Sequence, residues 1–419
     1  MRNTRRTLIA AVATIGALTS VAACGGGSDS SASGSGSGNS GGTYTFWDPY
    51  PQFDASSPWV ELVAKCGTDA GVTVKRTAMD TTDLGNKALL AAQQGNAPDV
   101  MLVDNPVVST LVEAGILNKT GDLGLNTSAI QKNILGAGEI DGAPYGVPIG
   151  ANTLALYYNK QVLSKAGVDP ASVKDWASLT AALEKVKAAG KKGITFSAIN
   201  TEEGSFQFLP WFWGAGGDLT KLNSAKGVAA LALWKQWVDE GYAPKDVLQN
   251  TQTTSWQEFA TGDYAFGENG TWQLGNADKA GFPYGVISIP AQSGGAAPVP
   301  TGGEFVTVPV QKDSSRYDVT KKIVTCLTSS ANLLSTDTTL AYVAPTAAVQ
   351  GEQVKANPEL KPWVDAVAAA RGRTSGGLGT KYPTISQPMW TAVQSALSGG
   401  KSPQTALDAA QTAADKGGN

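Results

Sequence analysis

Histidine is absent from the 419 residues of this chain. Its absence excludes the Ser-His-Asp and Cys-His catalytic arrangements and every metal site with a histidine ligand, and with them many classes of enzyme. Charged residues are also few, at 16% of the chain, and they form no basic run. The formal net charge of −3 therefore argues against nucleic acid or an anionic surface as a partner.

The chain also lacks a long apolar run, and its amino terminus has the pattern of an export signal. Basic residues at the start precede an apolar segment, residues 8–17, that is too short to span a membrane as a helix. Val21-Ala22-Ala23-Cys24 then resembles the lipobox of bacterial lipoproteins, in which the cysteine becomes the acylated first residue. We therefore expect a lipoprotein signal peptide over residues 1–23 and a lipid on Cys24. An ordinary Ala-x-Ala cleavage site is the alternative.

Cysteine is scarce as well, with only three in the chain. Once Cys24 carries a lipid, Cys66 and Cys326 remain, and in an exported chain two such residues favour a disulfide. Residues 25–42 are almost entirely Gly, Ser, Ala and Asn, so they cannot bury apolar area. We expect residues 24–42 to be the lipidated cysteine and a flexible tether that keeps the folded part outside the cell, close to its membrane.

From residue 43 onward, strand-like and helix-like segments alternate. Residues 43–47, 72–74 and 97–103 are typical of strands, and helices are predicted from Ser57-Pro58 and over 84–94. Strands that alternate with helices at this spacing predict a parallel α/β sheet. Because 419 residues are too many for one hydrophobic core, we expect at least two domains.

One stretch, residues 145–167, combines three signals. Tyr145-Gly146-Val147-Pro148 has the composition of a turn, and the apolar run 154–158 is typical of a buried strand. Asn159 then begins a predicted helix that closes at Gly167. We therefore expect a turn, a buried strand and a helix in succession.

Several motifs and their order resemble one known family. They are Ala97-Pro98-Asp99-Val100, then residues 145–160, then Gly270-Thr271-Trp272, then Gly302-Gly303, and a last helix from Ser402-Pro403. This pattern is similar to that of the sugar-binding lipoproteins of ABC importers, extracellular solute-binding protein family 1, the group that includes the maltose-binding protein. The resemblance covers nearly the whole chain after residue 43. A helix beginning at Met389-Trp390 is expected before the last one.

The resemblance implies a two-lobed, periplasmic-binding-protein-like fold of the α/β class. Each lobe would be a mainly parallel sheet flanked by helices, and several crossovers would form the hinge. In the family the stretch that matches residues 145–167 leaves the first lobe and begins the second, so residues 150–153 would be the first crossover. Lobe 1 would comprise residues 43–150 plus 304–343, and lobe 2 residues 151–303 plus 344–419 with the C-terminal helices. Family topology puts Cys66 and Cys326 on helices of lobe 1, so we expect them to be bridged. Two unpaired buried thiols are the alternative.

The same resemblance implies a function. The chain would be no enzyme but the lipid-anchored extracellular component of an ABC importer, binding an oligosaccharide between its lobes by hinge closure. It would be a monomer that docks on ABC permease subunits, without cofactor, metal or nucleic acid. A receptor for a non-sugar solute such as a polyamine is the alternative. A secreted glycoside hydrolase, which needs two carboxylates across a bond, is a further one.

Sugar recognition requires two kinds of side chain. Hydroxyls bind to carboxylates, amides and Arg, and the C–H faces of sugar rings pack on flat aromatics. In α/β sheets such ligands bind beyond the carboxyl ends of strands. In lobe 1 we therefore expect contacts from strand ends and the first crossover, namely Trp47, Asp48, Asp104, Asn105 and Asn152. The alternatives are a core Trp47, a turn cap at Asp48 and a helix cap at Asp104.

In the remainder of the chain, Trp272 matches the stacking aromatic of the family. The other expected contacts are Phe206, Gln207, Trp213, Glu268, Gly303, Glu304, Arg371 and Trp390. Arg371 and Arg373 share a loop-like stretch, and a solvated surface is the alternative for both. Aromatic residues at helical or strand spacing are usually core residues, so we expect this of Trp211, Trp234 and Trp237.

Overall fold

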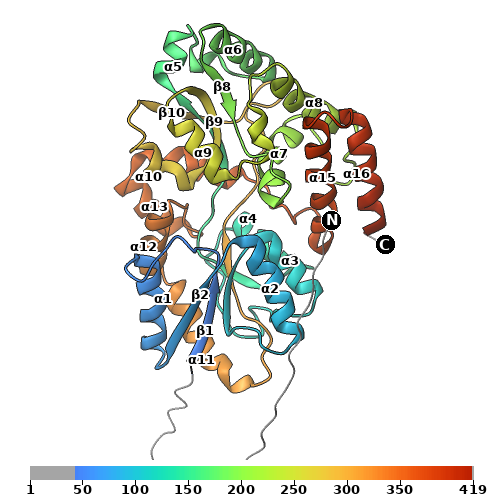
Figure 1. Cartoon of the computed structure of the whole chain (residues 1–419). Coiled ribbons are helices and arrows are strands. Elements are labelled where there is room, and N and C mark those ends of the chain that lie inside the picture. The colour runs from blue at the N-terminus through green and yellow to red at the C-terminus, as the bar shows by residue number, and fades with distance from the viewer. Residues whose placement is uncertain (1–42, 418–419) are drawn as a thin grey trace, which may run out of the picture. The chain divides into compact units, whose positions relative to one another are not determined.

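The computed structural model describes residues 43–417 (Figure 1). The predicted signal peptide (1–23), the predicted lipidation site Cys24 and the predicted tether (24–42) lie outside the described residues. The described residues form an α/β fold that contains two main sheets. The predicted fold class is confirmed.

The first sheet has five strands. In spatial order these are β2 (Thr73–Ala78), β1 (Thr43–Asp48), β3 (Val100–Asp104), β11 (Glu304–Thr307) and β6 (Gly146–Pro148). β1 pairs in parallel with β2 and β3, whereas β11 is antiparallel to β3 and β6. This sheet and its helices are called lobe 1 below. The helices are α1 (Pro58–Asp69), α2 (Thr81–Gln93), α3 (Asn105–Glu113), α11 (Tyr317–Leu327) and α12 (Ser330–Leu340).

The second sheet has four strands. In spatial order these are β10 (Tyr284–Ile287), β7 (Leu154–Asn159), β9 (Tyr264–Gly270) and β8 (Lys192–Thr195). This sheet and its helices are called lobe 2. The helices include α5 (Lys160–Lys165), α6 (Trp176–Ala188), α7 (Glu202–Gly214), α8 (Ala225–Asp239), α9 (Gln252–Ala260), α15 (Tyr382–Leu397) and α16 (Pro403–Gly417).

The strand directions differ from the mainly parallel sheets that we expected. In lobe 2 only β8 and β9 are parallel, while β7 is antiparallel to both β9 and β10. The reason lies in the crossovers. β7 and β11 each follow directly after a segment that comes from the other lobe. They therefore enter their sheets at the edge where β3 and β9 end, and run in the opposite direction.

The segments that connect the lobes lie side by side. Residues between β6 and β7 pair with two other segments, through an Ala151–Val343 bridge and an Asn152–Gly302 bridge. Glycine is required here, since a Cβ at Gly303 would lie 2.5 Å from the carbonyl oxygen of residue 150, and the φ of Gly303 is +114°. The stretch that was predicted to begin the hinge is thus one of three adjacent connections.

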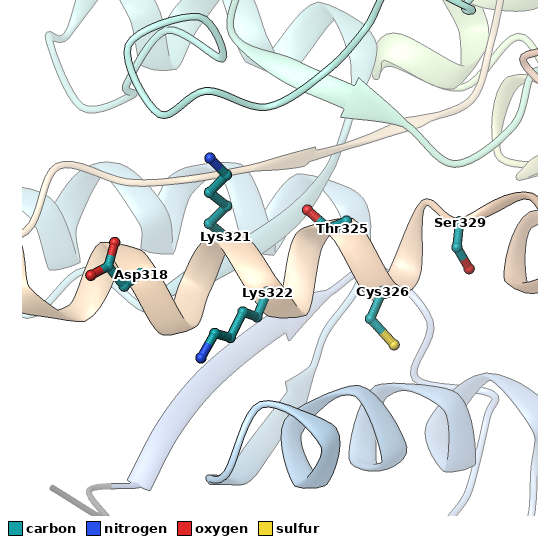
Figure 2. A pocket seen from close by; sticks show the side chains of 6 residues that line it. All are labelled: Asp318, Lys321, Lys322, Thr325, Cys326 and Ser329. Carbon is teal, nitrogen blue, oxygen red and sulfur yellow. The ribbon is translucent and has the colours of Figure 1, made fainter. Parts of the chain in front are cut away.

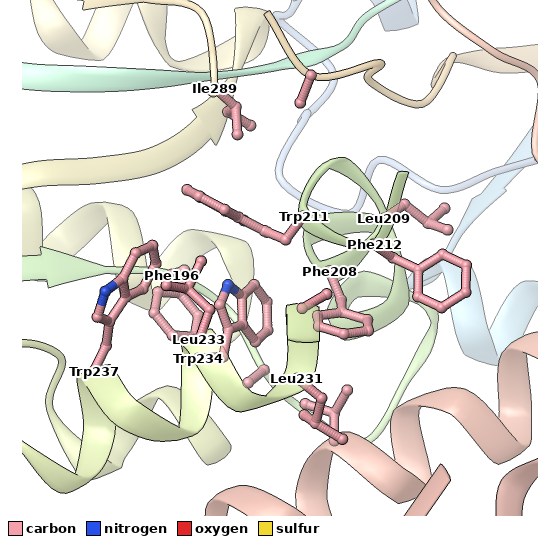
Figure 3. Close-up of a cluster of buried hydrophobic side chains, with 14 of the residues drawn as sticks. Phe196, Phe208, Leu209, Trp211, Phe212, Leu231, Leu233, Trp234, Trp237 and Ile289 are labelled. Atoms are coloured by element: carbon pink, nitrogen blue, oxygen red, sulfur yellow. The ribbon is translucent and has the colours of Figure 1, made fainter. Parts of the chain in front are cut away.

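The core of lobe 2 is rich in aromatic side chains. Trp211, Trp234 and Trp237 have 0% exposed surface, which confirms their predicted place in the core. Phe196 stacks on Trp234 at 4.1 Å between ring centroids, and Trp211 meets Trp237 edge-on at 5.0 Å. Figure 3 shows these rings between α7, α8 and the sheet. The unusual number of tryptophans therefore serves packing first.

Cys66 of α1 and Cys326 of α11 form the expected disulfide, with their Cα atoms 5.6 Å apart. The two helices that it joins both pack on the five-stranded sheet. α1 begins as predicted, because Ser57 accepts a hydrogen bond from the Val60 amide and Pro58 occupies the first helical position. The bridge ties two segments of lobe 1 that are 260 residues apart in sequence.

One predicted boundary is wrong. α15 begins at Tyr382, so Met389 and Trp390 lie in the middle of a helix rather than at its start. Pro388 misled the prediction because proline usually ends or begins a helix, yet this helix continues through it. The smaller elements are α4 (Lys132–Leu135), β4 (Glu139–Ile140), β5 (Ala143–Pro144), α10 (Leu274–Ala277), α13 (Ala347–Ala356) and α14 (Lys361–Ala369).

Candidate functional site

A buried carboxyl group lies beside the connections between the lobes. Glu304 begins β11 and is 9% exposed. Its Oε2 accepts a hydrogen bond of 2.7 Å from the Tyr50 hydroxyl, and its Oε1 accepts one of 3.3 Å from the Tyr342 hydroxyl. No ion pair is formed with it among the described residues. The side-chain hydrogen bonds of its carboxyl group among the described residues thus come from two phenols.

Burial raises the pKa of Glu304 to about 7, and the neighbouring carboxylate of Asp104 adds to the increase. Glu304 and Asp104 are paired across the antiparallel strands β11 and β3. The hydrogen bonds from Tyr50 and Tyr342 oppose the increase without cancelling it. Glu304 is thus an acceptor whose protonation changes near neutral pH, and a hydrogen-bond donor placed beside it would favour the ionised form.

An aromatic pair faces the same region from lobe 2. Trp272 is half-buried just after β9, and its ring centroid lies 6.4 Å from that of Phe206 on α7. Trp272 packs against the hydrophobic cores of both lobes. Gly270 permits this placement, since a Cβ there would lie 2.0 Å from a ring atom of Trp272. The glycine two residues before the tryptophan therefore sets the position of the ring.

Asp104 and Asn105, the end of β3 and the start of α3, meet a buried arginine. The Nη2 atom of Arg373 lies 2.9 Å and 3.1 Å from the two Asp104 carboxylate oxygens and 3.1 Å from Asn105 Oδ1. The Asn105 side chain also donates to the carbonyl of Thr301, in the connection between the lobes that contains Gly302. Both predicted contact residues thus lie at the junction of the lobes, where Arg373 occupies their acceptors.

Asn152 and Gly303 lie at the same junction. Asn152 is 5% exposed, and a Cβ at Gly302 would lie 2.0 Å from its Oδ1 and 3.0 Å from the Phe206 ring. The structure therefore brings together part of the predicted set. The residues that meet at the junction are Asp104, Asn105, Asn152, Phe206, Trp272, Gly303 and Glu304.

Trp47 and Asp48 lie apart from this group. The Asp48 carboxylate has 0% exposed surface and forms an ion pair with Arg76. It also accepts hydrogen bonds from the Trp59 indole and the Tyr50 amide. Trp47 packs against the apolar cluster on one face of the five-stranded sheet. All acceptor positions of Asp48 are therefore used within lobe 1.

Gln207 and Glu268 are buried in lobe 2, where hydrogen bonds hold both side chains. Gln207 accepts from the Ser197 amide and donates to the Glu268 carbonyl. The Glu268 carboxylate accepts from the Trp211 indole at 2.8 Å, while its second oxygen, Oε1, is buried without a partner among the residues that the structure describes. Burial raises the pKa of Glu268 well above its ordinary value. The hydrogen-bond partners of both side chains belong to lobe 2.

Three further predicted residues lie on lobe 2. Trp213 is 7% exposed within the lobe 2 core, and the Arg371 guanidinium lies 5.8 Å from its ring centroid. The Arg371 side chain is exposed, while its backbone pairs with Pro300 in the second connection. Trp390 is half-buried on α15. Of the two arginines in this stretch, Arg373 rather than Arg371 enters the junction.

Tyr50 and Tyr342 escaped the sequence analysis. Each hydroxyl is bonded to Glu304, from positions 254 and 38 residues away in sequence. Burial, and then the Glu304 carboxylate, raises the pKa of both phenols well above their ordinary value. Tyr50 lies two residues beyond Asp48, the end of β1, and ligand contacts were expected at this strand end. Nothing in the sequence near Tyr342 links it to Glu304.

Two surface hollows lie elsewhere. One, of about 680 Å³, lies along α11 beside the disulfide and is lined by Asp318, Lys321, Lys322, Thr325, Cys326 and Ser329 (Figure 2). Figure 2 shows the two lysines pointing in different directions from the helix. The other, of about 500 Å³, lies along α5. Neither contains a residue that was predicted to bind a ligand.

Residues 43–417 contain no group of three or more Asp, Glu or Cys side chains that could hold a metal ion. Within that range, each helix is also too short or too polar to cross a membrane. The junction instead offers hydrogen-bond acceptors, amides and flat aromatic rings. These groups suit a neutral, hydroxyl-bearing molecule.

Comparison with known proteins gives a consistent result. The sequence model of a family described as bacterial extracellular solute-binding protein matches residues 61–362. The maltodextrin-binding protein MdxE of Bacillus subtilis is 30% identical over 249 residues, which cover 55% of this chain and 57% of that relative. The match thus spans less than two thirds of MdxE.

Two further similarities cover more of the chain. The sn-glycerol-3-phosphate-binding periplasmic protein UgpB of Salmonella typhimurium is 25% identical over 374 residues, or 78% of this chain and 81% of UgpB. The GacH receptor of Streptomyces glaucescens, solved unliganded and with acarbose, has a TM-score of 0.74 and 25% identity. That match covers 89% of this chain and 97% of the receptor.

Proposed function

The chain belongs to the bacterial extracellular solute-binding proteins, and we propose that it captures an oligosaccharide between its two lobes for an ABC importer. Members of this family serve transport and are not enzymes, which sets aside the glycoside hydrolase alternative. The similarity to a maltodextrin-binding protein and to an acarbose receptor supports a sugar as the cargo.

The observation that carries the proposal is the position of Trp272. Its ring packs against the cores of both lobes and lies beside Phe206. The C–H face of a sugar ring would pack on such a flat surface. Glu304 and Asn152, which lie at the same junction, would accept and donate hydrogen bonds to its hydroxyls. A ligand held by these groups would contact both lobes at once.

We propose the other predicted contacts in two groups. Asp104, Asn105, Phe206 and Gly303 lie at the junction and would line the ligand. Trp47, Asp48, Gln207, Trp213, Glu268, Arg371 and Trp390 would act indirectly, by supporting that lining. We also propose the lobe boundaries at residues 43–150 plus 304–343 and at 151–303 plus 344–419.

The proposed mechanism is a shift between two arrangements of the lobes. The lobes must part to admit a ligand, and contacts from both sides then favour the closed arrangement. An affinity near micromolar, about −8 kcal/mol, would suit capture followed by release to a membrane permease. The protein would act as a monomer.

Attachment to the membrane is proposed from the amino terminus. Val21-Ala22-Ala23-Cys24 supports cleavage before Cys24 and its acylation, and residues 25–42 would act as the tether. The folded part would then remain at the extracellular face of the cell membrane, close to the permease subunits. Metabolic labelling with a radioactive fatty acid tests this. Label must enter the wild-type chain and must be absent from Cys24→Ser.

A non-sugar solute is the rival cargo. It is supported by the similarity to UgpB, described as an sn-glycerol-3-phosphate-binding protein, which extends over 81% of that protein. An anionic phosphate would need unpaired cations at the junction, but the guanidinium of Arg373 is already bonded to two carboxylates. A polyamine is a cation, so Glu304 in its ionised form would favour that alternative. Thermal-shift screening against saccharides, glycerol phosphate and polyamines separates the three.

The ligand found in that screen allows a sharper test. Trp272→Ala should weaken binding in calorimetry by about 2 kcal/mol, or roughly thirtyfold, because it removes the central flat surface. Phe282→Ala is the matched control, since Phe282 is a half-buried aromatic of lobe 2 that packs on Phe259 away from the junction. Equal affinity of wild type and Trp272→Ala would place the ligand elsewhere.

A further inference from the structure

Arg373 contacts residues of both lobes. It lies between α14 and α15, in a segment of lobe 2, and is only 2% exposed. On one side its Nη1 donates to Glu202 Oε1 at 2.8 Å, at the start of α7. On the other side its Nη2 donates to Asp104 and Asn105, at the start of α3 in lobe 1. Its guanidinium carbon also lies 4.7 Å from the ring centroid of Phe206.

The lobe 2 half of this network is firmly built. Glu202 accepts further hydrogen bonds from the Tyr382 hydroxyl at 2.6 Å and the Ser386 hydroxyl, both on α15. Burial raises the pKa of Glu202, and Arg373 and these hydroxyls lower it again in part. Glu202 therefore anchors the guanidinium within lobe 2, with or without lobe 1.

The lobe 1 half is a charged contact across the junction. A guanidinium that reaches both oxygens of a carboxylate forms a strong, directional contact. Because Arg373 is buried, water screens this contact little, and separating the lobes would leave the guanidinium with one of its two carboxylates. The Asp104–Arg373 pair is therefore a specific link between the lobes. The protein's own side chains form this link, and it needs no ligand.

We propose that Arg373 is a latch that positions Asp104 and Asn105 and adds to the stability of the closed arrangement of the lobes, with or without a solute. In the ligand-free protein the latch raises the fraction of molecules that are closed, and a solute then adds its own contacts to the same arrangement. The proposal deepens the proposed function, because it concerns the same junction. It does not depend on the identity of the cargo.

The latch should also affect the affinity of the protein for its solute. Because a solute that contacts both lobes binds the closed arrangement, a protein that spends less time closed has a lower apparent affinity. Loss of the latch should weaken solute binding although Arg373 need not touch the solute. Among residues 43–417 the buried Nε of Arg373 has no hydrogen-bond partner, so the network is not saturated within that part of the chain.

Small-angle X-ray scattering of the ligand-free protein is the test. Arg373→Met keeps the length of the side chain but removes its charge, and its scattering curve should shift to a larger radius of gyration than that of the wild type. Arg373→Lys should give an intermediate shift, since one ammonium cannot bridge three acceptors in the same way. Arg371→Met is the matched control, because Arg371 lies two residues away on the same segment and its exposed side chain lies beside the Trp213 ring of lobe 2.

The outcomes are distinct. A folded Arg373→Met variant with an unchanged curve overturns the latch, as does an equal shift in Arg371→Met. If Arg373→Met does not fold, Asp104→Asn tests the same link from lobe 1, and an unchanged curve for that variant also overturns it. Failure of the wild type to bind any saccharide would contradict the proposed function and leave the scattering result untouched.

Discussion

Replacement of Glu304 by Gln isolates the energetic consequence of a carboxyl group buried at the junction. Gln keeps the shape and one acceptor for the hydroxyls of Tyr50 and Tyr342, but it cannot ionise. In the wild type, burial and the charge of Asp104 raise the pKa of Glu304 to about 7, from an ordinary value of 4.5. This difference corresponds to roughly 3 kcal/mol between the two protonation states.

The direction of the pH effect on stability follows from the protons that the folded and unfolded states bind. Between pH 4.5 and 7 the folded protein holds a proton on Glu304 that the unfolded chain has lost. Stability therefore decreases as the pH rises through this window, and by pH 8 the wild type has lost about 3 kcal/mol from this group. The Glu304→Gln variant lacks this loss. Its free energy of unfolding relative to the wild type should rise by up to about 3 kcal/mol from pH 4.5 to pH 8.

Urea unfolding at several pH values measures this difference directly. Glu202, Glu268 and Asp337 also have raised pKa values and tilt the wild-type curve, but they are present in both proteins and cancel in the comparison. The m-value must remain equal between the two proteins for the comparison to hold. Parallel curves for wild type and Glu304→Gln across this range would refute the reasoning.

Three other predictions concern the disulfide of lobe 1, the buried carboxyl group of Asp337 and Gly270 beside Trp272. Replacing Cys66 and Cys326 by Ser should lower the free energy of unfolding in urea by roughly 2–4 kcal/mol, because the bridge closes a long loop, and equal stability would contradict this. Asp337→Asn should raise the melting temperature more at pH 8 than at pH 5, since burial raises the pKa of this unpartnered carboxyl, and an equal change at both pH values would count against it. Gly270→Ala should displace the Trp272 ring and weaken solute binding in calorimetry while unfolding stays cooperative, and wild-type affinity would refute the steric argument.

Much of the fold could be predicted because its signals are local. The N-cap at Ser57, the strand at 154–158 and the helix from Asn159 to Gly167 depend on neighbouring residues, and all three are confirmed. The strand directions could not be predicted in the same way. Direction depends on the side from which a strand enters its sheet, which is a property of the chain path.

The candidate site divides along the same line. Asn152, Trp272 and Glu304 were predicted from motifs at strand ends and crossovers, and the structure places them at the junction. Gln207 and Glu268 have the same residue types as ligand contacts, yet their side chains are bonded inside lobe 2. Sequence alone cannot distinguish a polar group that faces a solute from one that satisfies a buried neighbour.

The partners of Glu304 show the limit most clearly. Tyr50 lies 254 residues before it in the chain, and only the folded structure brings the two side chains within 2.7 Å. Arg373 likewise bonds to Asp104 over 269 positions. Contacts of this kind determine the ion pairs and the pKa values at the junction, and no local sequence pattern predicts them.

A crystal structure of the protein with the saccharide that binds most tightly would locate the binding site. We predict electron density for a sugar between the lobes, with one ring face on Trp272 and hydroxyls bonded to Glu304 and Asn152. A saccharide bound in the hollow along α11, or on one lobe alone, would contradict it.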